Sequence, residues 1–266
     1  MTSKNTITLS EALQTVIMNG FSGPSPNIDD PIFIQFRIKS HNPLIYNMIG
    51  MAVNKYLVSK LYVGTANGST PLSSIMRKVV LIIDSQICPN YKSSEFYPKC
   101  NSTKDIGCYN LSKYVNMESG TGTLRKYSYS NLMNQVTTPA TVLDSNKFET
   151  DITLFRLIEP GSENKNPNSI DFIKNYSVQF ITNSFNIKDK NLDDYEKMFF
   201  ENKSAFIPFS IALRQLSVFY PNLGCLLIPF SINVSHLCFQ INISNLFSLN
   251  LGCLSIPFPI NESHFC

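Results

Sequence analysis

Val79-Val-Leu-Ile-Ile-Asp84 is the stretch of sequence that decides the fold class. A continuous aliphatic run of this length is typical of a strand that is buried on both faces, as the strands of parallel sheets are. Ile32-Phe-Ile-Gln-Phe-Arg-Ile38 has the same character and follows a loop rich in proline, glycine and aspartate. Residues 43–61, between the two runs, have apolar side chains at helical spacing. The sequence therefore predicts parallel strands joined by helices.

The same alternation of strand and helix patterns continues through the chain up to about residue 215. Further strands are expected at residues 114–117, 151–158 and 178–185. Helices are expected at residues 8–20, 71–76, 130–136, 169–175 and 192–201. The predicted fold class is α/β with five strands, arranged as a parallel sheet or a barrel.

Composition excludes several classes of protein. Hydrophobic residues make up 43% of the 266 residues and charged residues 15%, so the chain can bury a sizeable core and is not disordered throughout. A net charge of +3 is too small to indicate nucleic-acid binding. No run of apolar residues is long enough for a membrane-spanning helix, and the polar start carries no secretory signal. We therefore expect a cytoplasmic protein without a nucleic-acid partner.

The C-terminal 50 residues differ from the rest, because no charged residue occurs between Gln215 and Asn261. Residues 223–238 recur as residues 251–266, with 12 of 16 positions identical. Two copies are too few for a repeat protein. We expect residues 1–216 to form the domain and residues 217–266 to be an appended, duplicated and poorly ordered tail. The alternative is that the uncharged tail pairs with an exposed edge of the sheet.

The duplicated tail contains the cysteines and histidines that would be needed for a zinc site. The candidate ligands are Cys225, His236, Cys238, Cys253, His264 and Cys266. Their spacing fits no common zinc signature, and duplication copies whatever residues a segment contains. We therefore expect no metal.

Three segments, taken in order, resemble the phosphatidylinositol-specific phospholipase C family, and especially the phospholipase C-like proteins of large DNA viruses. Residues 21–43 are similar to the turn and strand that open the second half of the family's catalytic X region. Tyr114-Val-Asn-Met-Glu-Ser-Gly120, followed by Leu124-Arg-Lys-Tyr-Ser-Tyr129, matches the viral members. Residues 154–214 resemble the closing strands of the family. The resemblance covers about residues 8–216.

The resemblance implies an incomplete TIM-type (β/α) barrel, in which the five expected strands are the fourth to the eighth. It implies a phosphoric diester hydrolase that acts on a phospholipid or related phosphodiester, with peripheral membrane contact. The family's two acid–base histidines belong to strands that would precede Met1, so this chain is expected to be truncated and inactive alone, with the N-terminal half of the barrel as a partner. The alternative is a non-catalytic protein that binds phosphate or lipid headgroups, or a structural viral protein, on the same scaffold.

Two basic residues at the end of the first strand are candidates for phosphate binding. Arg37 lies where calcium-dependent members of the family carry a carboxylate, so the resemblance implies no calcium and no other cofactor. Its guanidinium can bind phosphate oxygens with two hydrogen bonds, and Lys39 follows two residues later. The alternative for Arg37 is an ion-paired or solvated charge.

Arg156 falls where the family has an arginine that binds the headgroup phosphate. A cation on a buried strand needs a ligand or a carboxylate such as Glu159 or Glu118. We expect Arg37 and Arg156 to point into one cavity at the carboxyl ends of the strands. Arg125 and Tyr127, in the basic and aromatic run of residues 125–129, are further candidates for headgroup contact, with a solvated loop as the alternative.

Two other residues are candidates for catalysis. Asp84 ends its strand and can act as a base, as a partner for Arg37 or as a strand-end cap. His41 is the one histidine between residues 8 and 216, and it can serve as a general acid or base. One histidine cannot take both roles, and its position matches neither histidine of the family.

Overall fold

The computed structural model of the chain describes residues 8–22, 27–96, 109–129, 155–159, 165–176, 178–185, 187–208, 211, 238–245 and 248–250. The helices are α1 (Leu9–Gly20), α2 (Pro43–Tyr56), α3 (Leu72–Ile75), α6 (Ser169–Tyr176) and α7 (Lys190–Asn202), with 3₁₀ turns η1 (Ser94–Phe96) and η2 (Leu111–Tyr114). The strands are β1 (Ile32–Ile38), β2 (Val79–Asp84), β3 (Met117–Ser119), β4 (Leu124–Ser128), β5 (Phe155–Glu159), β6 (Phe180–Ile181), β7 (Cys238–Asn245) and β8 (Ser248–Asn250).

The two strands that the sequence marks most clearly, β1 and β2, have the expected bounds and pair in parallel, with Ile32 opposite Val79 and Phe36 opposite Ile83. Local signals also fix where helices begin. Thr8 and Glu11 form a capping box at the start of α1, and the Asn42 side chain accepts the Leu44 N–H at the start of α2. In this part of the chain β1 and β2 are parallel, and the segment between them contains α2 and α3.

The described strands form two sheets. One has the order β3-β2-β1-β7-β8, and the other has the order β4-β5-β6. All neighbouring strands are parallel except β7 and β8, which are antiparallel. Between β3 and β4 the chain turns at Gly120, whose φ of +89° is strained for other residues and where a Cβ would come within 2.3 Å of the Gln86 side chain.

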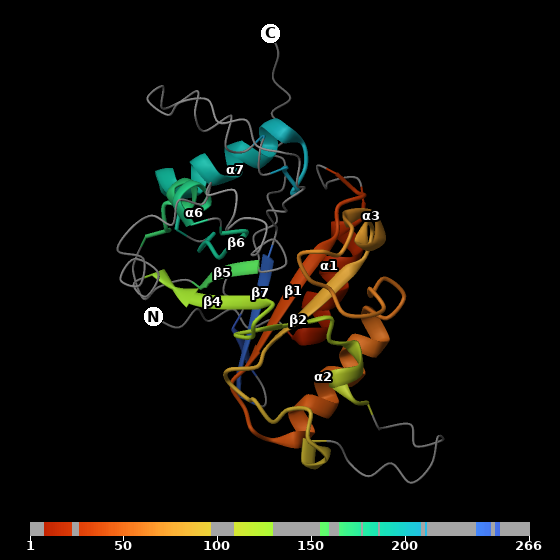
Figure 1. The fold of residues 1–266 in the computed structure, drawn as a ribbon. Coiled ribbons are helices and arrows are strands. Elements are labelled where there is room, and N and C mark those ends of the chain that lie inside the picture. Colours follow the sequence, from red (N-terminus) through yellow and green to blue (C-terminus); the bar gives the residue numbers. More distant parts are fainter. Residues whose placement is uncertain are drawn as a thin grey trace.

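Three apolar cores separate the layers. Helices α1 and α2 cover one face of β1 and β2, helices α6 and α7 cover the outer face of β5 and β6, and the two sheets face each other between them (Figure 1). The core between the sheets takes side chains from six strands and from the segment after α7: Phe33, Val80, Ile82, Met117, Leu124, Phe155, Leu157, Phe180 and Phe206. Strands β1, β2, β5 and β6 thus have an inner face toward this central core and an outer face toward helices.

Several stretches differ from the expectation. The strand expected at residues 178–185 is only Phe180–Ile181 in the structure. The strand expected at residues 114–117 begins later, because Asn110 caps the turn η2 and the side chain of Asn116 accepts the Leu81 N–H in place of a ladder carbonyl. The run at residues 124–128, expected to be a loop or a lipid-contact segment, is the strand β4. The expected helix at residues 130–136 and the start of the strand expected at residue 151 lie outside the described residues. No helix in the described part of the chain is long and apolar enough to span a membrane.

One segment of the tail belongs to the larger sheet. β7 pairs in parallel with β1, with Phe33 opposite Cys238 and Ile38 opposite Ile243. The tail was expected to add nothing to the domain, and the alternative was that it pairs with an edge of the sheet. The pairing of β7 with β1 is the arrangement of that alternative. The ladder covers an edge of β1 whose N–H and C=O groups would otherwise need other partners.

We predict that ending the chain after residue 237 destabilises the domain, whereas ending it after residue 250 does not. Loss of several ladder hydrogen bonds, each worth about 1 kcal/mol, should lower the free energy of unfolding by roughly 3 kcal/mol or more. Urea unfolding of both truncated chains against the full chain measures the difference. Equal stability of all three would show that β7 contributes nothing to the fold.

Candidate functional site

Charged residues lie at or near the carboxyl ends of β1, β2 and β5 and in the middle of β4, on the face that points toward the central core. Along β1, residues 32, 34, 36 and 38 pack toward the helices, while Phe33 packs in the central core. Arg37 shares the parity of Phe33 and so lies on the inner face. By the same alternation Asp84 lies on the face of Ile82 in β2, and Glu159 lies on the face of Leu157 in β5. Lys126 lies on the face of Leu124 in β4. Each of these charged residues comes two positions after a residue of the central core. Each inner face is therefore apolar at its start and charged toward its end.

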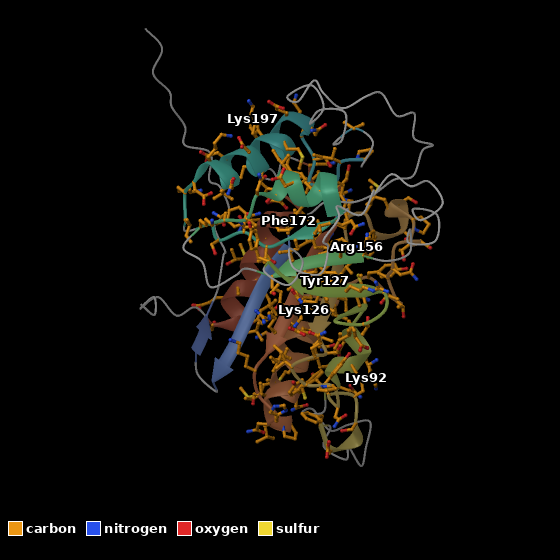
Figure 2. All side chains as sticks on the ribbon, turned by 60° about the vertical axis from the view of Figure 1, so that its left-hand side comes forward. Lys92, Lys126, Tyr127, Arg156, Phe172 and Lys197 are labelled. Atoms are coloured by element: carbon orange, nitrogen blue, oxygen red, sulfur yellow. The ribbon has the colours of Figure 1, made fainter. Side chains whose placement is uncertain are left out.

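These four residues form a partly buried network of ion pairs, here called the charge cluster (Arg37, Asp84, Lys126 and Glu159). Lys126 Nζ lies 2.9 Å from Oδ1 and 2.7 Å from Oδ2 of Asp84. Arg37 Nε donates to Asp84 Oδ2 at 3.2 Å. Figure 2 shows Lys126 in the crowded region between the two sheets, far from Lys197 on α7. The cluster joins the two sheets through electrostatic contacts at their carboxyl ends.

Glu159 completes the cluster from β5. Arg37 Nη2 donates to Glu159 Oε2 at 3.3 Å, Arg37 Nε lies 3.1 Å from Oε1, and Lys126 Nζ lies 3.5 Å from Oε1. Burial raises the pKa of the Glu159 carboxyl, and the neighbouring charge of Asp84 adds to this. The cations Arg37 and Lys126 act in the opposite direction. The net upward direction means that removal from water outweighs ion pairing at this position.

The four charges balance, and their side chains differ in access to water. Arg37 and Lys126 carry one positive charge each, and the two carboxylates cancel them. The exposed fraction of the side chain is 19% for Arg37, 14% for Glu159, 10% for Lys126 and 0% for Asp84. Asp84 is thus the innermost member, and Arg37 and Glu159 lie nearest to solvent. An anion that reaches the cluster from water meets these two side chains first.

A neutral polar pair lies deeper on the inner face. Gln35, two residues before Arg37 in β1, donates from Nε2 to Ser119 Oγ at 2.7 Å, and both side chains are fully buried. Gln35 Oε1 has no hydrogen-bond partner. Ser119 lies opposite Asp84 in the ladder between β2 and β3, so this pair adjoins the charge cluster.

The structure brings some of the predicted site residues together and leaves others apart. Arg37 and Asp84 are in the cluster, and Asp84 is a partner of Arg37, one of the roles expected for it. Lys39 and His41 are exposed in the connection between β1 and α2. Because Arg37 contacts two carboxylates, its ion-paired alternative is the one that the structure contains.

Strand position and parity place Arg156 apart from the charge cluster, on the other face of its sheet. It is the second residue of β5, near the amino end, whereas Arg37 is near the carboxyl end of β1. It also has the parity of Ile158, which packs on the core beneath α6 and α7. Figure 2 shows Arg156 and Lys126 at separate places along the paired strands. The carboxylates expected as its partners have other contacts, since Glu159 meets Arg37 and Glu118 pairs with Lys92.

The other candidates on β4 also face away from the cluster. Tyr127 packs against the core beneath α6 and α7, and Arg125 is exposed. Lys126, which lies between them, is the residue of this run that reaches the site. The signal that would have found it is the alternation of β4, since Leu124, Lys126 and Ser128 share one face once residues 124–128 are recognised as a strand.

The structure does not describe most of the candidate zinc ligands of the tail. Five of the six candidate ligands lie outside the described residues, and Cys238 is described as the first residue of β7. Within the described part of the chain, no group of three or more His, Cys, Asp or Glu side chains is arranged to hold a metal ion.

A scan against models of known protein families found no match, and a search of curated proteins found none either.

We predict that Asp84→Asn strongly destabilises the protein, because it leaves Arg37 and Lys126 buried with one carboxylate between them. Breaking a buried ion pair from one side costs about 3–5 kcal/mol. The matched control is Asp194→Asn, which removes an exposed pair with Lys190 on α7 and should cost at most about 0.5 kcal/mol. Urea unfolding at neutral pH measures both, and similar stabilities of the two variants would contradict a structural role for the cluster.

Proposed function

We propose that the chain binds the phosphate of a phosphodiester at the charge cluster, as the phosphate-binding part of a phospholipase C-like protein. The observation that carries the proposal is that Arg37 and Lys126, on strands of different sheets, both lie within 3.5 Å of one oxygen of Glu159. Two cations that converge on one oxygen from different directions can hold a phosphate oxygen in the same way. The phosphate would belong to a phospholipid headgroup or a related soluble diester.

The position of the cluster supports this proposal. In parallel α/β proteins, ligands bind at the carboxyl ends of the strands, where side chains from several strands meet. Arg37 and Glu159 reach solvent from this end. The two cations also differ in what they offer, because arginine presents a planar fork to two oxygens and lysine presents a compact charge.

We propose the incomplete (β/α) barrel as the scaffold. Two observations support it. Strands β1, β2 and β3 follow in parallel order in one sheet, and β4, β5 and β6 do so in the other. Helices lie outside and an apolar core lies inside. β3 and β4 do not pair with each other, but the tight turn at Gly120 joins them directly. The two strands are therefore close in sequence and in space. In this scaffold the inner faces of all six strands surround one interior.

The site favours binding of a phosphodiester, without its hydrolysis by the described residues. Acid–base cleavage of a phosphodiester needs two groups that exchange protons near the phosphate. Asp84 is engaged with both cations, and His41, the histidine in the described part of the chain, is exposed after β1 instead of lying in the cluster. An acid–base pair would have to come from residues other than these.

We predict that Arg37→Lys weakens binding of a phosphodiester by roughly tenfold, because lysine keeps the charge but loses the second hydrogen bond of the fork. Calorimetric titration with glycerophosphoinositol measures the affinity. The matched control is Arg77→Lys, since Arg77 forms an exposed pair with Asp29 and should bind as the unchanged protein does.

Absence of binding by the unchanged protein would contradict the proposed function. Equal affinity of Arg37→Lys and Arg77→Lys would place the ligand elsewhere. Thermal unfolding of each variant distinguishes a loss of contact from a loss of fold.

We also predict that the 266-residue chain does not hydrolyse phosphatidylinositol or a soluble phosphodiester above background. Each missing acid–base group removes about 10²–10⁴ in rate. Release of inositol phosphate from vesicles measures the activity. Turnover that disappears with His41→Ala would contradict the prediction and identify His41 as catalytic.

A further inference from the structure

The two carboxylates of the charge cluster are held very differently. Asp84 accepts four hydrogen bonds, two from Lys126 Nζ, one from Arg37 Nε and one from the backbone N–H of Gln86 at 3.2 Å. Its side chain has no exposed surface. Glu159 accepts a hydrogen bond from Arg37 at Oε2 at 3.3 Å, and Lys126 Nζ, 3.5 Å from its buried Oε1, adds only a weak one. Asp84 is therefore a fixed part of the structure, while Glu159 is held mainly by charge.

Glu159 also occupies the place toward which both cations converge, and its Oε1, the oxygen nearest to both, is buried. Arg37 reaches both of its oxygens, with distances of 3.1 Å and 3.3 Å, and Lys126 lies 3.5 Å from Oε1. Its side chain is partly exposed, at the last residue of β5. A carboxylate with this contact set has the charge and the paired oxygens of one edge of a phosphate group.

We propose that Glu159 is an internal competitor of the ligand: its carboxylate occupies the phosphate position in the ligand-free protein, and phosphate binds by displacing it toward water. The inference rests on the proposed function and adds how that site is regulated. The ligand that fits is a tetrahedral oxyanion with at least two free oxygens, such as a phosphodiester or inorganic phosphate.

Displacement is feasible for Glu159 and not for Asp84. Moving Glu159 breaks a long hydrogen bond to Arg37 and a weak one to Lys126 and returns a side chain that is already 14% exposed to water, whereas moving Asp84 breaks four hydrogen bonds and exposes the innermost charge. The phosphate replaces the negative charge that Glu159 withdraws, so the two buried cations stay neutralised. Burial raises the pKa of the Glu159 carboxyl, and this cost of removal from water is relieved when the side chain moves outward.

The exchange predicts a dependence on pH with a definite sign. The charged groups that face Glu159 are Arg37 from β1, Lys126 from β4 and Asp84 from β2. Because the pKa of Glu159 is raised, the carboxylate takes up a proton as the pH falls, at a higher pH than an exposed glutamate would. A neutral Glu159 no longer competes for the cations. Affinity for a phosphodiester, whose own charge does not change in this range, should therefore increase as the pH falls.

The test is the variant Glu159→Gln, which keeps the shape of the side chain and removes its charge. It should bind glycerophosphoinositol roughly tenfold more tightly than the unchanged protein at neutral pH, and its affinity should no longer depend on pH. The matched control is Glu196→Gln on α7, which removes one negative charge far from the site and should change neither property. Calorimetric titration at a series of pH values from neutral downward provides the measurement.

Two further ligands identify the source of the phosphate. Tighter binding of Glu159→Gln to both inorganic phosphate and glycerophosphoinositol supports exchange at a general phosphate site. Tighter binding to glycerophosphoinositol and to vesicles that contain phosphatidylinositol, without inorganic phosphate binding, supports exchange at a headgroup site. If Glu159→Gln does not fold, Glu159→Asp, whose shorter side chain reaches the cations less well, should also bind more tightly.

The outcomes separate the inference from the function on which it rests. If the unchanged protein binds phosphodiester but Glu159→Gln binds with equal or lower affinity, the inference is overturned and the proposed function stands. If neither protein binds any of the ligands at any pH, the proposed function itself is overturned. Binding by both proteins with the same pH dependence would also overturn the role of Glu159.

Discussion

The burial of the Asp84 carboxylate between Arg37 and Lys126 is the constraint on which the arrangement of this domain depends. A charge with no exposed surface is tolerated only with partners close by, and these partners come from β1 in one sheet and β4 in the other. The ion pairs therefore fix how the carboxyl ends of the two sheets face each other. Apolar packing below them fills the space but is less selective about register, because one aliphatic side chain can substitute for another.

Strand alternation connects this constraint to the core and to the site. Inner positions of β1, β2, β4 and β5 are apolar where the strands begin and polar or charged where they end, so one face of each strand serves both packing and chemistry. The same alternation explains why Arg37 lies in the cluster and Arg156 does not. Arg156 is an odd number of residues from Glu159, and a shift of one position moves a side chain to the opposite face. The phosphate site that we propose thus depends on parity as much as on residue type.

Balanced charge gives the cluster its proposed behaviour. Two cations facing two carboxylates have no net attraction for an anion, and a phosphate can gain access only by replacing one of the carboxylates. The unequal hydrogen bonding of Asp84 and Glu159 determines which one can leave. An arrangement of this kind keeps the buried cations paired in the absence of ligand, at a cost in affinity that protonation of Glu159 would remove.

The sequence by itself determined the local structure: the aliphatic runs of β1 and β2, the Thr8 and Asn42 caps, and the helical spacing of residues 43–56 each depend on neighbours along the chain. It also indicated Arg37 and Asp84 as strand-end charges. Only the tertiary structure decided which charges meet, because Lys126 and Glu159 come from strands far away in sequence and their inner faces are set by a pairing that residues 124–128 do not reveal alone. It likewise decided that β7 pairs with β1. An uncharged segment can pair with many strand edges, so its sequence does not specify the partner, and the open edge of β1 provides it.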